Sequence, residues 1–138
     1  MTDHADRLDI ERLISRFFLF LDERRYGDLS ALMSPDGVWH RQGKALRGPG
    51  DVTEAMKSRP GGATTRHLVT NFVIDVTDST HAEATFYLAV FFHGADTPPK
   101  LPVPLELPRH ISIFSAKFVR GASGWKVADL SEIPTFAK

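Results

Sequence analysis

Cysteine is missing from the 138 residues of this chain. Its absence excludes disulfide bonds, thiolate nucleophiles and cysteine-ligated zinc or iron–sulfur sites. A net charge is missing as well, because lysine plus arginine and aspartate plus glutamate each number 17. Nucleic-acid binding depends on clustered positive charge, so we expect no nucleic-acid partner.

Long apolar runs are also absent. No stretch approaches the roughly 20 apolar residues that a membrane-spanning helix requires, and the acidic start MTDHADRLDIERL lacks the apolar run of a signal peptide. We therefore expect a soluble, cytoplasmic protein without a membrane partner. The length suits one hydrophobic core, and we expect a single domain over residues 1–138.

Phenylalanine is in excess, with 10 copies against 2 Trp and 2 Tyr, which indicates an aromatic interior. Apolar residues recur at helical spacing over residues 6–25, which predicts an amphipathic helix that ends at Gly27. We expect a short helix over residues 28–33, two short strands over residues 37–48 and a third helix that begins at Pro49.

The rest of the chain is rich in β-branched and aromatic residues at a period of two. This pattern predicts four long strands, at residues 65–77, 81–93, 109–120 and 124–133. Two of the connections are short enough for antiparallel hairpins, so we expect a meander, and the proline-rich residues 94–108 form a loop. The element order predicts an α+β fold with N-terminal helices on one antiparallel sheet, and strong curling of that sheet would leave a cavity.

Asp22 and His67 are the candidate acid/base residues of this sequence. Asp22 follows Phe18 by four residues, which places it on the flank of the apolar helix stripe. His67 lies near the start of the first long strand, and histidine takes up and releases protons near neutral pH. On residue patterns alone, Asp22 could equally be a surface carboxylate that pairs with an arginine such as Arg25, and a lone strand histidine is more often structural.

Strand alternation predicts which side chains share a face. It places His67, Val69 and Asn71 together, and it places His110 on the face of Phe114. No histidine pair has the spacing of a strong metal motif, so we expect no bound metal. No nucleophile elbow and no phosphate loop is present, which leaves hydrolysis by a serine triad and nucleotide binding without support.

Four segments carry a resemblance to a known family. FFLFLDERRYGDLSALMSPDGVW, LRGPGDV, TTRHLVTNFVID and GWKVADLSEI resemble the SnoaL-like domains around scytalone dehydratase, within the nuclear transport factor 2-like superfamily. The resemblance covers nearly the whole chain and implies a cone-shaped, cystatin-like fold with a pocket. It also implies that Asp22 and His67 form an acid/base pair. The second histidine and the tyrosines of the dehydratases are missing, because the matching strand reads Thr85, Phe86 and Tyr87.

The resemblance implies a cofactor-independent lyase or isomerase, similar to a dehydratase or cyclase, that acts on a small hydrophobic oxygenated ring compound. Asp22 and His67 would be its catalytic pair, and Tyr87 or His110 could donate to a substrate oxygen. The side chains that we expect to bind substrate are Phe17, Phe18, Leu21, Trp39, Val69, Asn71, Tyr87, His110 and Phe114.

Two other functions stay open at this point. TRHLVTNFVI is also similar to the small β subunits of aromatic-ring dioxygenases, which are noncatalytic partners, and the same fold could bind a small molecule without turnover. An open sheet has two faces and the helices can cover one of them. We therefore expect a homo-oligomer, a dimer that packs the outer sheet face.

Overall fold

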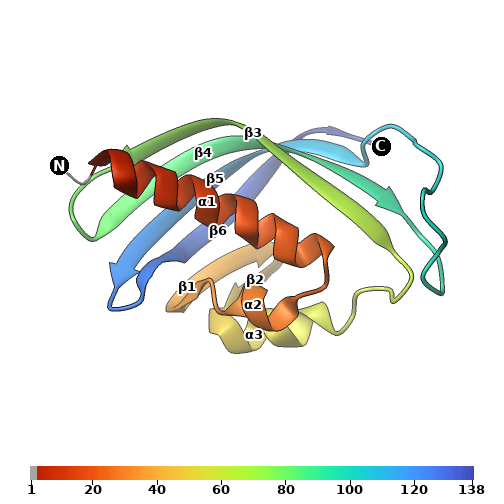
Figure 1. The fold of residues 1–138 in the computed structure, drawn as a ribbon, viewed down its shortest axis with the longest axis horizontal. Helices are drawn as coiled ribbons and strands as arrows, with labels where there is room; N and C mark the ends of the chain where they lie inside the picture. The colour runs from red at the N-terminus through yellow and green to blue at the C-terminus, as the bar shows by residue number, and fades with distance from the viewer. Residues whose placement is uncertain (1–2) are drawn as a thin grey trace.

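The computed structural model describes residues 3–138 and shows helices packed on one six-stranded sheet (Figure 1). The α+β class is therefore confirmed. In chain order, the elements are α1 (Asp3–Asp22), α2 (Tyr26–Ser30), β1 (Met33–Arg41), β2 (Lys44–Arg47), α3 (Gly48–Met56), β3 (Thr64–Val76), β4 (His81–His93), β5 (His110–Gly121) and β6 (Gly124–Ala137). None of the described helices is long and apolar enough to cross a membrane.

The strands lie in the order β2-β1-β6-β5-β4-β3. Strands β3 to β6 pair antiparallel with their chain neighbours, which confirms the predicted meander. The expectation of an entirely antiparallel sheet is wrong, because β1 pairs with β6 in parallel, with Trp39 opposite Leu130. Parallel pairing requires a long connection, and here α3 and four strands, β2 to β5, separate the two partners along the chain.

The first helix ends earlier than its sequence pattern predicts. It stops at Asp22, and Arg24 adopts the left-handed conformation with a φ of 60°. The amide of Arg25 then donates to the carbonyl of Phe20, which closes the helix end. The predicted terminator Gly27 lies instead inside α2, which begins at Tyr26.

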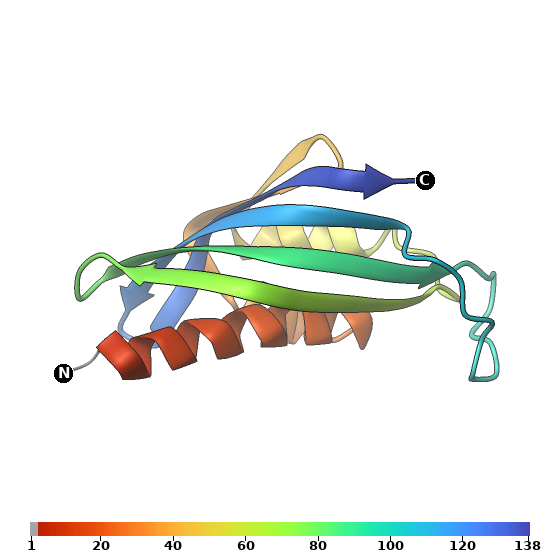
Figure 2. The same cartoon turned by 90° about the horizontal axis from the view of Figure 1, so that it is seen from above.

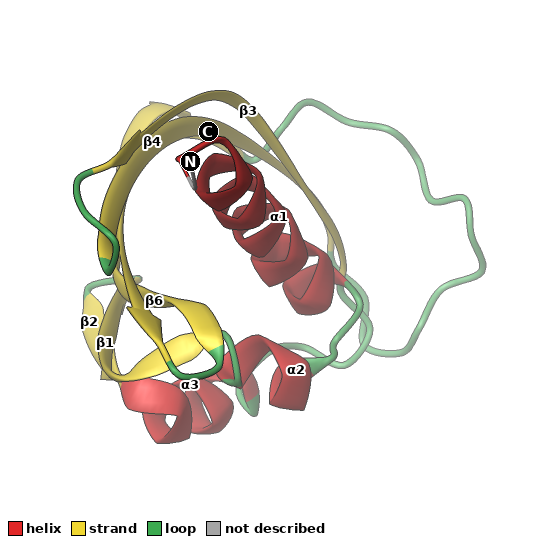
Figure 3. Cartoon of the chain, turned by 60° about the vertical axis from the view of Figure 1, so that its left-hand side comes forward, coloured by secondary structure: helices red, strands yellow, loops and turns green. Residues whose placement is uncertain are grey.

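Helix α1 lies along the inner face of the sheet, as Figures 2 and 3 show from two directions. The buried core side chains come from this helix and from the strands that it covers. Phe86 and Phe114, from neighbouring strands, stack with ring centroids 5.2 Å apart. Phe18 of α1 meets both rings edge-on, at 6.1 Å and 5.5 Å. The phenylalanine excess is thus explained by an aromatic layer that joins helix to sheet.

A β-bulge in β3 changes which side chains face inward. Asn71 has a φ of 56°, and the register with β4 shifts between Thr70 and Val73. Before the bulge His67 faces inward, whereas after it Phe72 does. The expectation that Asn71 shares a face with His67 is therefore wrong, because the extra residue of the bulge turns Asn71 outward.

The outer face of the sheet carries an exposed apolar row. Tyr87, Ile113 and Ile133 are direct neighbours across β4, β5 and β6, and they are 49%, 36% and 70% exposed. Such a row is typical of a surface that another molecule covers. The dimer that we expect on this face stays a prediction.

Candidate functional site

A cavity of about 520 Å³ lies beside the C-terminal end of α1, bounded by β1, by β3 to β6 and by the loop after α3. Its size suits a small organic ligand. The lining residues are Phe18, Leu21, Trp39, Arg41, Gln42, Ser58, Arg59, Pro60, Ala63, Thr65, His67, Leu88, Val90, Phe92, Arg109, His110, Phe114 and Glu132.

The structure brings Asp22 and His67 together in one wall of this cavity. His67 Nδ1 lies 2.5 Å from Asp22 Oδ1, and the backbone N–H of His67 donates to Asp22 Oδ2 over 2.9 Å. Since a carboxylate only accepts, Nδ1 carries the hydrogen in this contact. The other ring nitrogen, Nε2, is then the one free to exchange a proton with a ligand.

The alternative that Asp22 is a surface carboxylate paired with Arg25 does not hold. The Asp22 side chain is 5% exposed, and Arg25 pairs instead with Asp28 at 2.8 Å. Thr65 also donates its hydroxyl to Asp22 Oδ1 over 2.8 Å. The buried carboxylate therefore has three donors, all from the start of β3.

The imidazole ring is held in plane as well as in position. Phe18 stacks on His67 with centroids 5.3 Å apart and an interplanar angle of 28°. Because Phe18 and Asp22 are one helical turn apart, α1 presents a stacking partner and a hydrogen-bond acceptor to the same histidine. His67 is 13% exposed, so a ligand in the cavity can reach it while bulk water largely cannot.

Two residues that support the pair were missed by sequence reasoning. Thr65 lies two positions before His67 on the same strand face, and this spacing could have revealed it. Arg59 donates to Thr65 Oγ1 at 3.2 Å, to the Leu21 carbonyl at 2.7 Å and to the Tyr26 hydroxyl at 2.8 Å. Arg59 comes from a loop, where no periodicity indicates a direction.

A second histidine and carboxylate face the cavity from β5 and β6. His110 Nε2 lies 3.5 Å from Glu132 Oε2, and each side chain is just under one-third exposed. Glu132 is directly opposite Phe114 in the β5–β6 ladder, so both point to the inner face. No sequence motif marks Glu132, which lies near the end of a strand that sequence patterns predict to stop at residue 133.

Five of the predicted substrate-binding residues line the cavity: Phe18, Leu21, Trp39, His110 and Phe114. Phe17 lies outside it, because it is buried in the core with its ring 4.9 Å from that of Trp39. Val69 also lies outside the cavity. It is the next inward-facing residue of β3 after His67, and it packs against the core.

Tyr87 and Asn71 are misplaced by the sequence prediction. In β4 the inward positions are Phe86, Leu88 and Val90, so alternation turns Tyr87 to the outer face. Asn71 is exposed at the bulge. The hypothesis that Tyr87 donates to a substrate oxygen is therefore wrong, and neither Tyr87 nor Asn71 belongs to the site.

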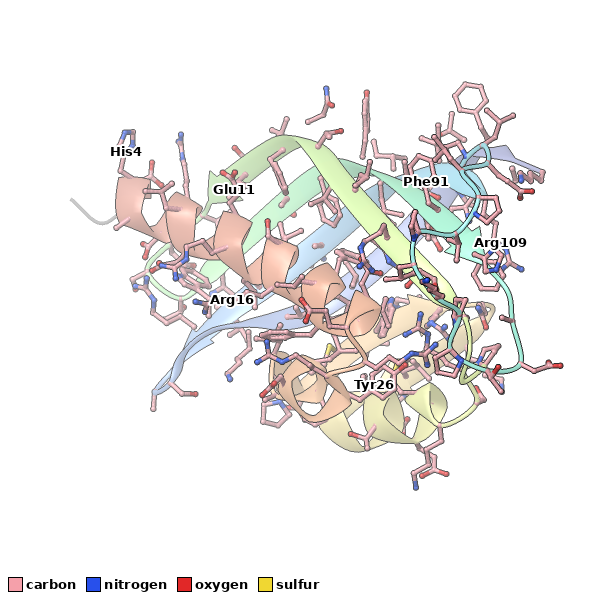
Figure 4. All side chains as sticks on the ribbon, turned by 45° about the vertical axis from the view of Figure 1, so that its right-hand side comes forward. His4, Glu11, Arg16, Tyr26, Phe91 and Arg109 are labelled. Atoms are coloured by element: carbon pink, nitrogen blue, oxygen red, sulfur yellow. The ribbon has the colours of Figure 1, made fainter. Side chains whose placement is uncertain are left out.

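The polar part of the cavity is rich in arginine. Burial lowers the pKa of the Arg41 guanidinium below its ordinary value, and the positive charge of Arg59 lowers it further, while Tyr26 and Glu132 act in the opposite sense. Arg109 lies at the rim, near Phe91 and the loop of residues 94–108 (Figure 4). Across residues 3–138, no three His, Asp or Glu side chains gather where they could hold a metal ion.

Solved structures with the same fold include proteins of several kinds. Hexachlorocyclohexane dehydrochlorinase LinA-type3 from Novosphingobium barchaimii matches with a TM-score of 0.77 at 16% identity, over 97% of this chain and 89% of that one. A nuclear transport factor 2-like protein with a cystatin-like fold from Novosphingobium aromaticivorans matches with a TM-score of 0.77 at 19% identity, over 97% and 84%.

A third structure is a Catenulispora acidiphila protein in complex with S-DNPA. It matches with a TM-score of 0.73 at 22% identity, over 95% of this chain and 94% of that one. At these identities the likeness shows the fold, which confirms the predicted nuclear transport factor 2-like, cystatin-like class. No curated protein matches the chain in sequence.

The family itself is shown by sequence. The family model of the SnoaL-like domain matches residues 2–131, which is nearly the whole chain. The order of elements and the helix–sheet core agree with that match. This chain therefore belongs to the family of SnoaL-like domains.

Proposed function

We propose that this protein is a cofactor-independent lyase or isomerase that moves a proton at a carbon next to a carbonyl group of a small ring compound. The observation that carries the proposal is the Asp22–His67 contact of 2.5 Å in the wall of an aromatic cavity. A histidine oriented by a buried carboxylate is a general base whose free nitrogen points to the ligand.

In the proposed reaction, His67 Nε2 accepts a proton from the carbon, and the electron pair of that C–H bond moves into the carbonyl group to form an enolate. The resulting imidazolium lies against the Asp22 carboxylate, which stabilises its charge. The enolate then expels a leaving group from the neighbouring carbon, or it takes the proton back at another position. The first outcome is an elimination and the second an isomerisation.

The burial of the pair supports this chemistry. Phe18 and Thr65 restrict the ring and the carboxylate, so little reorganisation is needed when charge develops. Positioned acid/base catalysis of this kind contributes about two to four orders of magnitude in rate. A dehydrochlorinase with the same fold indicates that this architecture can host an elimination, although at 16% identity it does not assign one to this chain.

Ligand binding without turnover is the second candidate. It is favoured by the structural neighbour in complex with S-DNPA and by the apolar floor of the cavity. In that case the Asp22–His67 pair would serve as a fixed hydrogen-bonding element for a ligand oxygen. The two candidates differ in whether substitution of the pair removes turnover or changes affinity alone.

The experiment that tests the proposal is deuterium exchange at the α-carbon of ring ketones such as tetralone in heavy water, followed by proton NMR. We expect the protein to accelerate exchange, and we expect Asp22→Asn to lower the acceleration by about two orders of magnitude, since the amide cannot stabilise the imidazolium.

Asp28→Asn is the matched control for that experiment, because Asp28 is an exposed carboxylate that pairs with Arg25. We expect it to leave exchange unchanged. Exchange no faster than in buffer across a panel of ring ketones, or an Asp22→Asn variant as active as the wild type, would contradict the proposal.

A further inference from the structure

We propose that the ligand of this cavity carries an anionic oxygen group, such as a carboxylate, which Arg41 binds, while Arg109 adds positive charge at the rim. Its ring would lie on the aromatic floor. The inference names the substrate class of the proposed function and rests on it for the claim that the ligand is turned over. Binding of such a ligand depends on the charges of the cavity and not on turnover.

The cavity contains more positive than negative charge. Arg41, Arg59 and Arg109 line it, whereas Glu132 is the one carboxylate among its lining residues. Asp22 lies behind His67 and is engaged by it. Even with both Glu132 and the buried Asp22 charged, one positive charge remains in excess.

None of these arginines forms an ion pair within residues 3–138. The arginines that do are Arg7, Arg25 and Arg120, all of which lie outside this cavity. Guanidinium groups in partly buried positions are usually matched by a carboxylate or by a bound anion. Glu132 is the one carboxylate in the lining, and it pairs with His110 and not with an arginine, which leaves this role to a ligand.

The three arginines have different freedom to bind. Arg59 donates hydrogen bonds to the Leu21 carbonyl, the Tyr26 hydroxyl and Thr65 Oγ1. It therefore contributes positive charge to the cavity more than hydrogen bonds to a ligand. Arg41 makes one long contact, 3.5 Å to Gln42 Oε1. Its remaining N–H groups therefore have no protein acceptor in the described part of the chain, and it is the group that can donate to a ligand.

Aromatic rings hold the free guanidiniums in place. Arg41 lies over the Trp39 ring at 5.6 Å, and Arg109 lies over the Phe92 ring at 4.3 Å. Stacking on an aromatic face orients the planar fork of an arginine without using its donors. Both cations are thus positioned toward the cavity with their hydrogen-bonding capacity intact.

The lowered pKa of Arg41 agrees with a cation that has no ion-pair partner. Burial and the neighbouring Arg59 both lower the pKa of Arg41, which means that two like charges share a poorly hydrated space. A bound anion would compensate both. The positive potential of the arginines therefore favours binding of an anionic ligand, in addition to the contacts that its ring makes.

The rest of the lining sets the shape of the ligand. Phe18, Leu88 and Phe114 form an apolar floor, and the volume of about 520 Å³ is large enough for two fused rings. Arg41 belongs to β1 and His67 to β3. Strand β3 is one edge of the sheet, and β1 is next to the other edge, which is β2. A ring acid can therefore place its anionic end at Arg41 and its ring between Arg41 and the acid/base pair.

The experiment uses two probes of equal shape: naphthoate and the neutral naphthalene carboxamide, titrated into the full chain by isothermal calorimetry. We expect naphthoate to bind about tenfold more tightly, the size of one charge-assisted contact. We expect Arg41→Gln to remove most of this preference, with Arg109→Gln removing part of it. Arg12→Gln, an exposed arginine of α1, should leave the preference unchanged.

Three results would overturn the inference: equal affinity for the two probes, no binding of either at millimolar concentration, or a preference that survives both Arg41→Gln and Arg109→Gln. Because Arg109 is exposed at the rim, its variant keeps the test decisive should Arg41→Gln fail to fold. His67→Ala separates the two proposals. It should strongly lower the exchange of ring ketones while the preference for naphthoate persists. Exchange therefore tests the proposed function, and the preference for naphthoate tests the anion site.

Discussion

Replacing His67 with alanine is expected to lower α-carbon exchange of a ring ketone by about two to four orders of magnitude, the usual contribution of a positioned general base. The imidazole contacts the buried Asp22 carboxylate and also lines the cavity, which places its second nitrogen within reach of a ligand. The loss should appear in kcat more than in KM, because the base acts as the proton leaves the carbon. The measurement is the initial rate of deuterium incorporation under saturating ketone.

Exogenous imidazole provides the control for this variant. Alanine leaves a space the size of the ring between Phe18 and the cavity, so added imidazole should restore part of the rate to His67→Ala. His81→Ala is a matched substitution of a histidine that lies on the surface beside Asp78, and it should keep full activity. A His67→Ala protein that folds normally and retains the wild-type rate would refute the proposed role of His67.

The largest effect on stability is expected from Phe86→Ala. Phe86 is 1% exposed and contacts three rings, those of Phe18, Phe72 and Phe114. Its removal leaves a cavity in the layer that joins α1 to the sheet, and such substitutions lower the free energy of unfolding by about 3–5 kcal/mol. Urea unfolding followed by circular dichroism measures the change.

Phe136→Ala is the comparison for Phe86→Ala, because Phe136 is 66% exposed near the end of β6. Its effect should stay within about 0.5 kcal/mol. A loss below about 1 kcal/mol for Phe86→Ala would contradict the aromatic core, since a buried phenylalanine that packs well costs more than that to remove.

Periodicity alone was enough to predict the main elements. The apolar stripe of α1 and the alternation in β3 to β6 are local signals, and those elements form close to where the patterns place them. The pairing of Asp22 with His67 is not a local signal, because 45 residues separate the two. It entered as an implication of the family resemblance, and the structure brings the two side chains into contact.

The errors arise where one residue changes a pattern or where distant segments meet. The left-handed Asn71 shifts the inward positions of β3, and nothing in the alternation marks that residue as a bulge. The parallel pairing of β1 with β6 depends on the whole chain between them. Arg41 and Arg59 reach the cavity from a strand end and a loop, where sequence periodicity does not indicate a direction.

The state of the His67 ring decides whether Asp22 and His67 act as proposed. A long-range proton–nitrogen NMR spectrum distinguishes the two neutral forms of imidazole. We expect His67 to carry its hydrogen on Nδ1 with Nε2 bare, and we expect Asp22→Asn to disturb this preference. A His67 ring with its hydrogen on Nε2, or one that does not respond to Asp22→Asn, would show that the carboxylate does not orient a base toward the cavity.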